Sequence, residues 1–287
     1  MGTTRRGFLG GSAVGLFGAG LLGELLAAEA AAPKLRISAR HFGSNLEAAK
    51  KAGMDGVEVG VGGAADKLSI ADPKHRDRIK EQMKAAAGVA VSSLSMDLLN
   101  GCPVATDERA VAWLEQTIEA AKDLGAVGIL VPFFGKGGLL TGKELNKEAV
   151  DAVVAKMKEV APKAKAAGVC LGLENTCSAK QDLQILDAIG SEAVACYYDI
   201  GNSTGGGYDV PAELRELKGR LCPCLHFKDG GSYLGEGRVK MEPVAEALKA
   251  IDYSGWIVLE TSCPSKDAVA DCKRNGDYVR KLLGISG

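Results

Sequence analysis

The stretch GVCLGLEN at residues 168–175 predicts a helix end that is followed directly by a strand. It begins with Gly168, continues as a short apolar run and ends in Glu174-Asn175, and it follows the Ala/Lys/Glu-rich segment 147–167. A glycine after such a segment supplies the left-handed cap that ends a helix, and a short apolar run with polar flanks is typical of a buried strand. The stretch therefore indicates a helix that leads into a strand whose last residue is an acid.

The same unit repeats from residue 34 to the C-terminus. The expected strands are 35–38, 56–61, 89–94, 126–131, 169–174, 195–199, 224–227 and 256–260, and the expected helices are 45–52, 74–87, 108–124, 147–167, 182–189, 211–217, 242–251 and 266–283. Strands that alternate with helices favour a parallel sheet, and eight such units in about 250 residues fit an α/β fold of the closed (β/α)8 TIM barrel type. An open doubly wound sheet is the alternative, but no GxGxxG follows the first strand. We expect a single domain over residues 34–287. The short glycine-rich segments 135–142 and 201–207 are expected as loops after strands.

The composition is that of an ordinary globular protein. The chain has 287 residues, of which 46% are hydrophobic and 25% charged, and its 35 basic and 36 acidic residues give a net charge of −1. A balance so close to zero argues against nucleic acid as a partner, because nucleic-acid binding needs a basic surface.

Residues 1–33 differ from the rest of the chain. Arg5-Arg6 stand before the apolar segment 9–27, and the small-x-small pattern Ala28-Glu29-Ala30 follows. This order resembles a twin-arginine export signal, which implies the twin-arginine export machinery as a partner, removal of the signal and a periplasmic location. The resemblance also implies export in the folded state. An uncleaved membrane anchor is the alternative.

Eight cysteines are present, without a CxxC pair or a zinc-ribbon spacing. Cys170, Cys196, Cys222 and Cys224 lie in or beside expected strands. We interpret these four as small buried hydrophobic residues.

The last four expected strands each end in a residue that can bind a metal: Glu174, Asp199, His226 and Glu260. The intervals are 25, 27 and 34 residues, about one strand–helix unit each. Because the carboxyl ends of barrel strands meet at one rim, the four side chains should face a common point. Three carboxylates and one imidazole predict a site for a single divalent metal, with Mn or Mg preferred over Co or Zn.

The sequences around these residues are LGLEN at 171–175, YDIGN at 198–202, LHFKD at 225–229 and LET at 259–261. Together with the loop GEGR at 235–238, they resemble the sugar phosphate isomerase/epimerase family, the xylose-isomerase-like TIM barrels. The resemblance covers the chain from about residue 34 onward. It implies a metal held by the four residues above, with Glu174 and Glu260 also acting as acid and base, and a substrate contact at Lys228. Many family members have a histidine where this chain has Asn202.

Other polar residues at the same rim are candidates for substrate contacts. Besides Lys228 and Asn202 they are His41, Glu58 and Glu236. A salt bridge to Asp229 is the alternative for Lys228, and a structural ion pair inside the barrel mouth is the alternative for Glu58.

The expected function is a metal-dependent isomerase or epimerase that transfers a proton next to the carbonyl of a sugar or polyol. Delivery of the proton to the opposite face gives an epimer, and delivery to the neighbouring carbon gives an isomer. Loss of a β-hydroxyl instead is the elimination that a lyase catalyses. A metal-dependent lyase or hydrolase of an oxidised sugar or glycoside and a non-catalytic sugar-binding protein are the alternatives. A related three-zinc nuclease is excluded because the chain has only three histidines. The sequence does not decide whether the chain forms a homo-oligomer.

Overall fold

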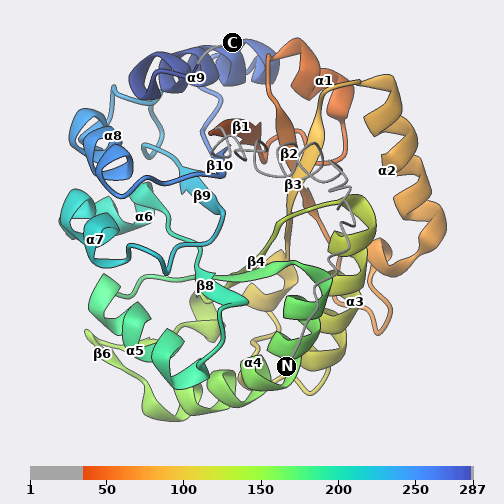
Figure 1. Cartoon of the computed structure of the whole chain (residues 1–287), viewed down its shortest axis with the longest axis vertical. Helices are drawn as coiled ribbons and strands as arrows, with labels where there is room; N and C mark the ends of the chain where they lie inside the picture. The colour runs from red at the N-terminus through yellow and green to blue at the C-terminus, as the bar shows by residue number, and fades with distance from the viewer. Residues whose placement is uncertain (1–34, 286–287) are drawn as a thin grey trace, which may run out of the picture. The chain divides into compact units, whose positions relative to one another are not determined.

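Eight parallel strands form the central sheet of the structure (Figure 1). The computed structural model describes residues 35–285. The hydrogen-bonded order of the strands is β8-β7-β4-β3-β2-β1-β10-β9. The expected export signal at residues 1–33 lies outside the described residues.

The two end strands of that order, β8 and β9, meet and close the barrel. Isolated parallel bridges join Cys196 to Leu221 and Asp199 to His226. The amide of His226 donates to the carbonyl of Tyr198 at 3.0 Å. The expected TIM barrel is therefore confirmed, and isolated bridges close it between β8 and β9.

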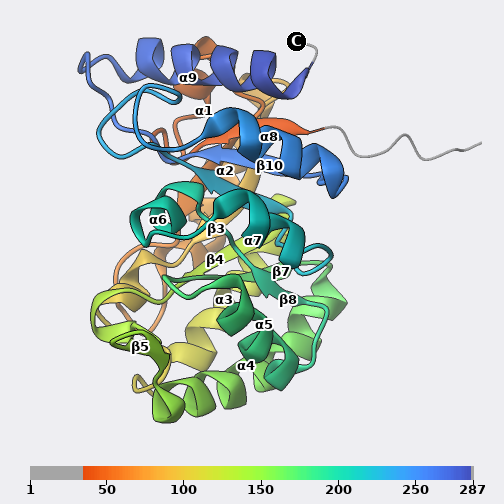
Figure 2. The same ribbon diagram turned by 90° about the vertical axis from the view of Figure 1, so that its left-hand side faces the viewer.

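Helices connect the strands and lie around their outside (Figures 1 and 2). The barrel strands are β1 (Arg36–Ala39), β2 (Gly56–Gly60), β3 (Ala90–Ser95), β4 (Gly128–Pro132), β7 (Cys170–Glu174), β8 (Val194–Cys196), β9 (Cys224–Phe227) and β10 (Trp256–Leu259). The helices are α1 (Leu46–Lys51), α2 (Pro73–Ala85), α3 (Ala110–Leu124), α4 (Lys147–Ala167), α5 (Ala179–Ile189), α6 (Ile200–Gly205), α7 (Val210–Glu216), α8 (Met241–Ala250) and α9 (Ala268–Leu283). A short antiparallel pair, β5 (Leu140–Thr141) and β6 (Glu144–Leu145), and three 3-10 turns at Ser69–Ala71, Asp97–Asn100 and Gly135–Gly137 complete the elements.

Helix α4 shows why the sequence forms these units. The side chain of Asn146 caps its first turn by accepting from the amide of Ala149, and Gly168 ends it with φ +70°. Only glycine adopts that left-handed conformation without a steric cost, so the chain turns directly into β7.

Two expectations near the barrel junction were wrong. The expected strand 195–199 is shorter, Val194–Cys196. The glycine-rich segment 201–207, expected as a loop, is largely helix α6. Asp199 explains the helix, because its Oδ1 accepts from the amides of Gly201 at 2.7 Å and Asn202 at 2.8 Å. The backbone N–H groups of a helix's first turn have no acceptor within the helix, and a capping carboxylate supplies one, which stabilises a short helix.

The two faces of the sheet pack into separate cores. Along β10, Ile257 and Leu259 belong to the large core under the helices, whereas Trp256 and Val258 belong to a smaller one. Since side chains alternate across a strand, the smaller core fills the barrel interior. The buried residues of this smaller core are Leu130, Ala195, Tyr197, Cys222, Cys224, Trp256 and Val258.

All eight cysteines are free thiols. Cys196, Cys222 and Cys224 are buried and Cys170 is half-buried, which agrees with the interpretation of these four as small hydrophobic residues. None of the helices within residues 35–285 is both long and apolar enough to cross a membrane.

Candidate metal centre

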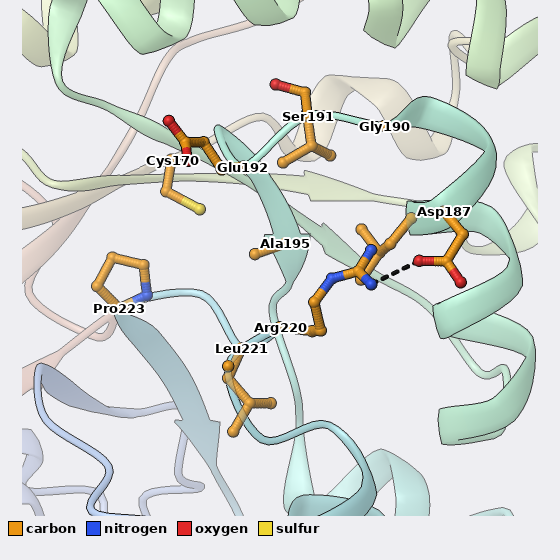
Figure 3. Close-up of a pocket in the computed structure, with 12 residues that line it drawn as sticks. Cys170, Asp187, Gly190, Ser191, Glu192, Ala195, Arg220, Leu221 and Pro223 are labelled. Atoms are coloured by element: carbon orange, nitrogen blue, oxygen red, sulfur yellow. Dashed lines mark hydrogen bonds and ion pairs between the residues drawn. The ribbon is translucent and has the colours of Figure 1, made fainter.

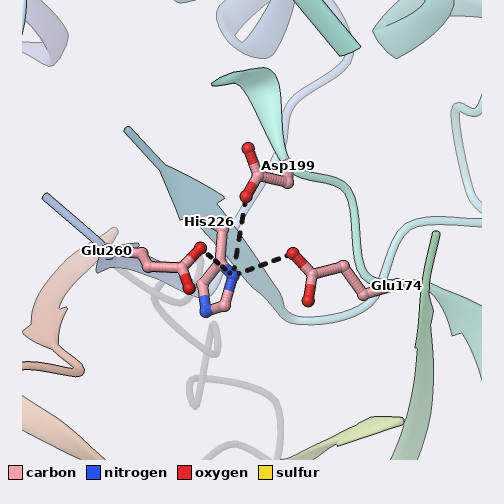
Figure 4. A group of neighbouring side chains, drawn as sticks. All are labelled: Glu174, Asp199, His226 and Glu260. Atoms are coloured by element: carbon pink, nitrogen blue, oxygen red, sulfur yellow. Dashed lines mark hydrogen bonds and ion pairs between the residues drawn. The ribbon is translucent and has the colours of Figure 1, made fainter. Parts of the chain in front are cut away.

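The structure brings Glu174, Asp199, His226 and Glu260 together at the carboxyl ends of the strands (Figure 4). Glu174 is the last residue of β7, His226 lies in β9, Glu260 directly follows β10, and Asp199 caps α6. One ligand atom from each residue lies within 4.8 Å of the others. This is the grouping that the spacing of the strand ends predicted.

The imidazole of His226 lies at the centre of the cluster. Its Nδ1 is 3.1 Å from Glu174 Oε1, 3.2 Å from Glu260 Oε2 and 3.8 Å from Asp199 Oδ2. Figure 4 shows the three carboxylates directed at the same side of the ring. His226 is fully buried, and Glu174 and Asp199 are nearly so.

The crowding of acids in a buried place changes their affinities for protons. Burial, together with the carboxylates of Asp199 and Glu260, raises the pKa of Glu174 to about 7 despite the nearby imidazole. Burial works in the same direction at Glu260, but His226 and Lys228 outweigh it, so the pKa of Glu260 lies well below its usual range. Burial disfavours the imidazolium of His226, yet Glu58 and Glu174 raise its pKa well above the usual value.

The donor set fits a divalent cation. Asp199 Oδ2 is buried and accepts no hydrogen bond from the residues that the structure describes. Lys228 Nζ is 2.8 Å from that oxygen as an ion pair, without hydrogen-bond geometry. Three carboxylates around one imidazole nitrogen repel one another until a positive charge lies between them, and oxygen-rich sets of this kind suit Mn or Mg.

Two of the expected substrate contacts lie beside the cluster. Lys228 Nζ donates to Glu260 Oε2 at 2.7 Å, and Asn202 Nδ2 lies 3.3 Å from Glu174 Oε1. Both residues also line a cavity of about 340 Å³ together with Arg238. The alternative pairing of Lys228 with Asp229 is not seen, because the Asp229 carboxylate accepts the amides of residues 237–239 instead.

Glu58 does not occupy the place of a hydroxyl contact. Its side chain has no exposed surface, and its Oε1 lies 3.2 Å from His226 Nε2. This ring edge is opposite the acid cluster, which is formed by the carboxylates of Glu174, Asp199 and Glu260. Ser93 and Tyr197 donate to its Oε2. Burial raises the pKa of Glu58, but His226, Arg40 and Tyr197 outweigh it, so the pKa is lowered. The alternative of a structural ion pair inside the barrel mouth describes this position better.

The two remaining candidates lie apart from the four ligands. His41 is exposed and its Nδ1 is 3.4 Å from Cys263 Sγ. Glu236 is exposed and pairs with Arg274 of α9. In this arrangement neither side chain contacts a member of the acid cluster.

Arg40 is a site residue that the sequence reasoning missed. It follows β1 and lies 3.4 Å from Glu58, 2.7 Å from Asp97 and 3.6 Å from Glu260. Its place at the end of a strand is visible in the sequence, but a guanidinium is not a metal ligand, so a pattern of strand-end ligands does not include it. The three carboxylates raise the pKa of Arg40 against the effect of burial.

A larger cavity, of about 660 Å³, lies elsewhere on the barrel (Figure 3). It is formed by the start of β8, the end of α5 and the segment before β9, and Arg220 pairs with Asp187 at its edge. None of the four clustered residues lines it.

Comparisons with known proteins agree with this fold. Residues 46–282 match the model of the xylose isomerase-like TIM barrel family. The L-ribulose-5-phosphate 3-epimerase UlaE of Escherichia coli (strain SMS-3-5 / SECEC) is 26% identical over 265 residues, which cover 84% of this chain and 90% of the relative.

Solved structures show the same fold. The structure of L-ribulose 3-epimerase has a TM-score of 0.71 at 23% identity, over 87% of this chain and 95% of that one. The 3-keto-D-glucoside 4-epimerase YcjR from E. coli also has a TM-score of 0.71, at 18% identity, over 87% of this chain and 99% of that one. Because the family model spans most of the sequence, the chain belongs to the xylose isomerase-like TIM barrel family.

Proposed function

We propose that this protein is a divalent-metal-dependent isomerase or epimerase that transfers a proton next to the carbonyl of a sugar or polyol. The observation that carries the proposal is the convergence of Glu174, Asp199, Glu260 and His226 at one point of the barrel rim. The three similar proteins described above, UlaE, L-ribulose 3-epimerase and YcjR, are named as sugar epimerases, which supports the reaction class.

The four clustered residues would hold the metal, with Mn or Mg preferred and Co or Zn as alternatives. When bound, the cation supplies positive charge for the oxygen that becomes negative as the neighbouring carbon loses its proton.

The two glutamates would move the proton. Glu174 and Glu260 approach the cluster from β7 and β10, which lie on opposite sides of the β8–β9 junction. A substrate carbon between them would lose its proton to one carboxylate and receive a proton from the other on the opposite face, which gives an epimer. Lys228 and Asn202, beside Glu260 and Glu174, would bind substrate oxygens.

A metal-dependent lyase or hydrolase of a keto sugar or glycoside is the second candidate. The same loss of a proton begins an elimination, and the YcjR structure is that of an enzyme named for a keto-glucoside. A purely sugar-binding role is disfavoured, since such a protein has no need of four intact ligands.

The finer properties are also proposals. The paired arginines Arg5-Arg6 and the apolar segment 9–27 support export through the twin-arginine machinery to the periplasm. Phosphorylated sugars are mainly cytoplasmic, so we propose an unphosphorylated substrate, although the relative UlaE is named for a sugar phosphate. Asn202 in place of a family histidine supports a substrate that differs from those of the relatives.

Deuterium uptake tests the reaction. Protein loaded with Mn²⁺ is incubated in heavy water with L-ribulose, D-psicose or a 3-keto-glucoside, and deuterium at the carbon next to the carbonyl is measured by mass spectrometry. We expect uptake with at least one substrate, its loss after chelation, and a rate lower by at least about 100-fold in Glu260→Gln, because a positioned base contributes that much.

The matched control is Glu119→Gln, at a surface glutamate on α3 that pairs with Lys163. It should exchange at the wild-type rate. Absence of uptake with every substrate, or full activity of Glu260→Gln, would refute the proposed proton transfer.

A further inference from the structure

Glu58 is a fully buried carboxylate whose two oxygens are both engaged by named partners. Its Oε1 lies 3.2 Å from His226 Nε2 and 3.4 Å from Arg40. Its Oε2 accepts from Ser93 Oγ and from Tyr197 OH, both at 2.7 Å. With no exposed side-chain surface, it has no route to a substrate.

We infer that Glu58 is a positioning residue for the metal centre, which accepts the Nε2 proton of His226 and so keeps the Nδ1 lone pair directed at the acid cluster. The inference rests on the metal-binding part of the proposed function. A neutral imidazole carries one proton and one free lone pair, and the partner of one nitrogen decides which nitrogen can bind a metal.

The surroundings of the ring leave little choice of geometry. Tyr197 packs its ring edge-on against His226, with centroids 4.8 Å apart, and its hydroxyl is the one that donates to Glu58. The same tyrosine therefore restricts the plane of the imidazole and fixes the carboxylate that accepts from it. On the other ring edge, Nδ1 faces oxygens of Glu174 and Glu260 at 3.1 and 3.2 Å.

A merely structural role, the neutralisation of Arg40, explains less. Arg40 has a shorter ion pair with Asp97, at 2.7 Å, and also lies 3.6 Å from Glu260. It would keep these two carboxylates without Glu58. His226 Nε2, in contrast, has Glu58 as its only partner within residues 35–285.

The first test is metal affinity in the absence of substrate. The full-length protein and Glu58→Gln are titrated with Mn²⁺ and with Co²⁺ against a chromophoric chelator, and circular dichroism checks that the variant is folded. We expect a dissociation constant 10- to 100-fold higher for Glu58→Gln, since loss of such outer partners weakens metal sites by about that factor.

Asp97→Asn is the matched control, because it removes a carboxylate from Arg40 without touching His226. Its affinity should stay within about twofold of the wild type. If Asp97→Asn and Glu58→Gln weaken binding equally, or if Glu58→Gln binds as tightly as the wild type, the positioning role is wrong while the proposed function stands. If the wild type binds neither cation, the metal-dependent function and this inference both fall.

A second measurement needs no variant at Glu58. The chain has only three histidines, so a long-range ¹H–¹⁵N spectrum of the Zn²⁺-loaded, ¹⁵N-labelled protein contains three imidazole patterns. A His226→Gln spectrum assigns the pattern of His226. We expect a protonated Nε2 and a metal-bound Nδ1; a proton on Nδ1, or a metal on Nε2, would overturn the inference even if every Glu58 variant failed to fold.

Discussion

Asp182 is a buried acid away from the metal centre whose protonation should control the stability of the barrel. Its Oδ1 accepts from Asn175 at 2.8 Å and its Oδ2 lies 3.3 Å from Cys196 Sγ. Burial raises its pKa from 3.8 to about 7, against the effect of these hydrogen bonds, and the carboxylate of Glu213 adds to the rise. The folded protein therefore holds this proton more tightly than the unfolded chain does.

The contribution of Asp182 to stability depends on pH. The stabilisation from protonated Asp182 is fully present below about pH 4 and is lost as the pH rises through about 7. Asp182→Asn has no proton to lose, so we expect its free energy of unfolding, relative to the wild type, to increase by about 3 kcal/mol from pH 5 to pH 8, because the pKa in the folded protein lies about two pH units above the start of this range. Urea unfolding at several pH values measures this difference. Asp187→Asn, at an exposed position of the same helix, should show no such trend, and parallel curves for Asp182→Asn would contradict the prediction.

The four clustered residues could be predicted from the sequence because each stands at a strand end, where a barrel collects side chains from distant segments. Glu58 shows the limit of that reasoning. Its place between Val57 and Val59 indicates a side chain directed into the barrel, but the depth at which it meets His226 depends on the stagger of the strands. That stagger includes a register shift between β2 and β3 at Val57 and Glu58, for which the sequence carries no signal.

At the scale of elements, the loop between β9 and α8 depends on one carboxylate. Asp229 is buried and accepts the amides of Gly237 at 2.9 Å, Arg238 at 2.7 Å and Val239 at 2.9 Å. A Cβ at Gly237 would collide with Asp229 Oδ1, so only glycine allows the loop to approach this closely. The loop in turn places Arg238 at the cavity beside Lys228.

Asp229→Asn should therefore loosen the loop more than the fold. The amide nitrogen of the new side chain must face a backbone donor, so at least one of the three hydrogen bonds is lost, at a cost of about 2 kcal/mol. We expect a Tm lower by about 4–8 °C and faster amide hydrogen exchange at residues 235–239, measured by mass spectrometry. Asp277→Asn, which removes an exposed pair with Lys273, should change neither the Tm nor the exchange. Unchanged exchange in Asp229→Asn would show that other contacts hold the loop.

Most elements could be predicted because the apolar pattern changes period at each glycine that ends a helix. The errors concentrate where a side chain overrides that pattern. Residues 201–207 are rich in glycine and predict a loop, yet the Asp199 cap makes most of them α6. The ends of β8 were wrong for a related reason, since the chain leaves the sheet to bring Asp199 beside His226.

At the scale of the whole molecule, the metal centre depends on completion of the fold. Its ligands come from β7, the cap of α6, β9 and the end of β10, so the site exists only when the last strand has entered the sheet. A metal that binds such a site binds the folded chain and stabilises it. The proposed export route carries folded chains, and a site of this kind would be complete before such export.

The export proposal predicts where the folded protein is found and where its chain begins. When the full chain is expressed in a bacterium with a periplasm, we expect folded protein in the periplasmic fraction with Ala31 as its first residue, because Ala28-Glu29-Ala30 has the small residues of a cleavage site. The joint substitution Arg5→Lys and Arg6→Lys should retain the uncleaved chain in the cytoplasm, since the twin-arginine signal is read through the arginine pair itself and not through charge alone. Lys50→Arg with Lys51→Arg, an equally conservative change at a basic pair of α1, is the control and should be exported normally. Equal export of the two paired variants would show that another route is used. Wild-type protein in the membrane fraction with residues 1–30 still attached would identify the segment as an anchor.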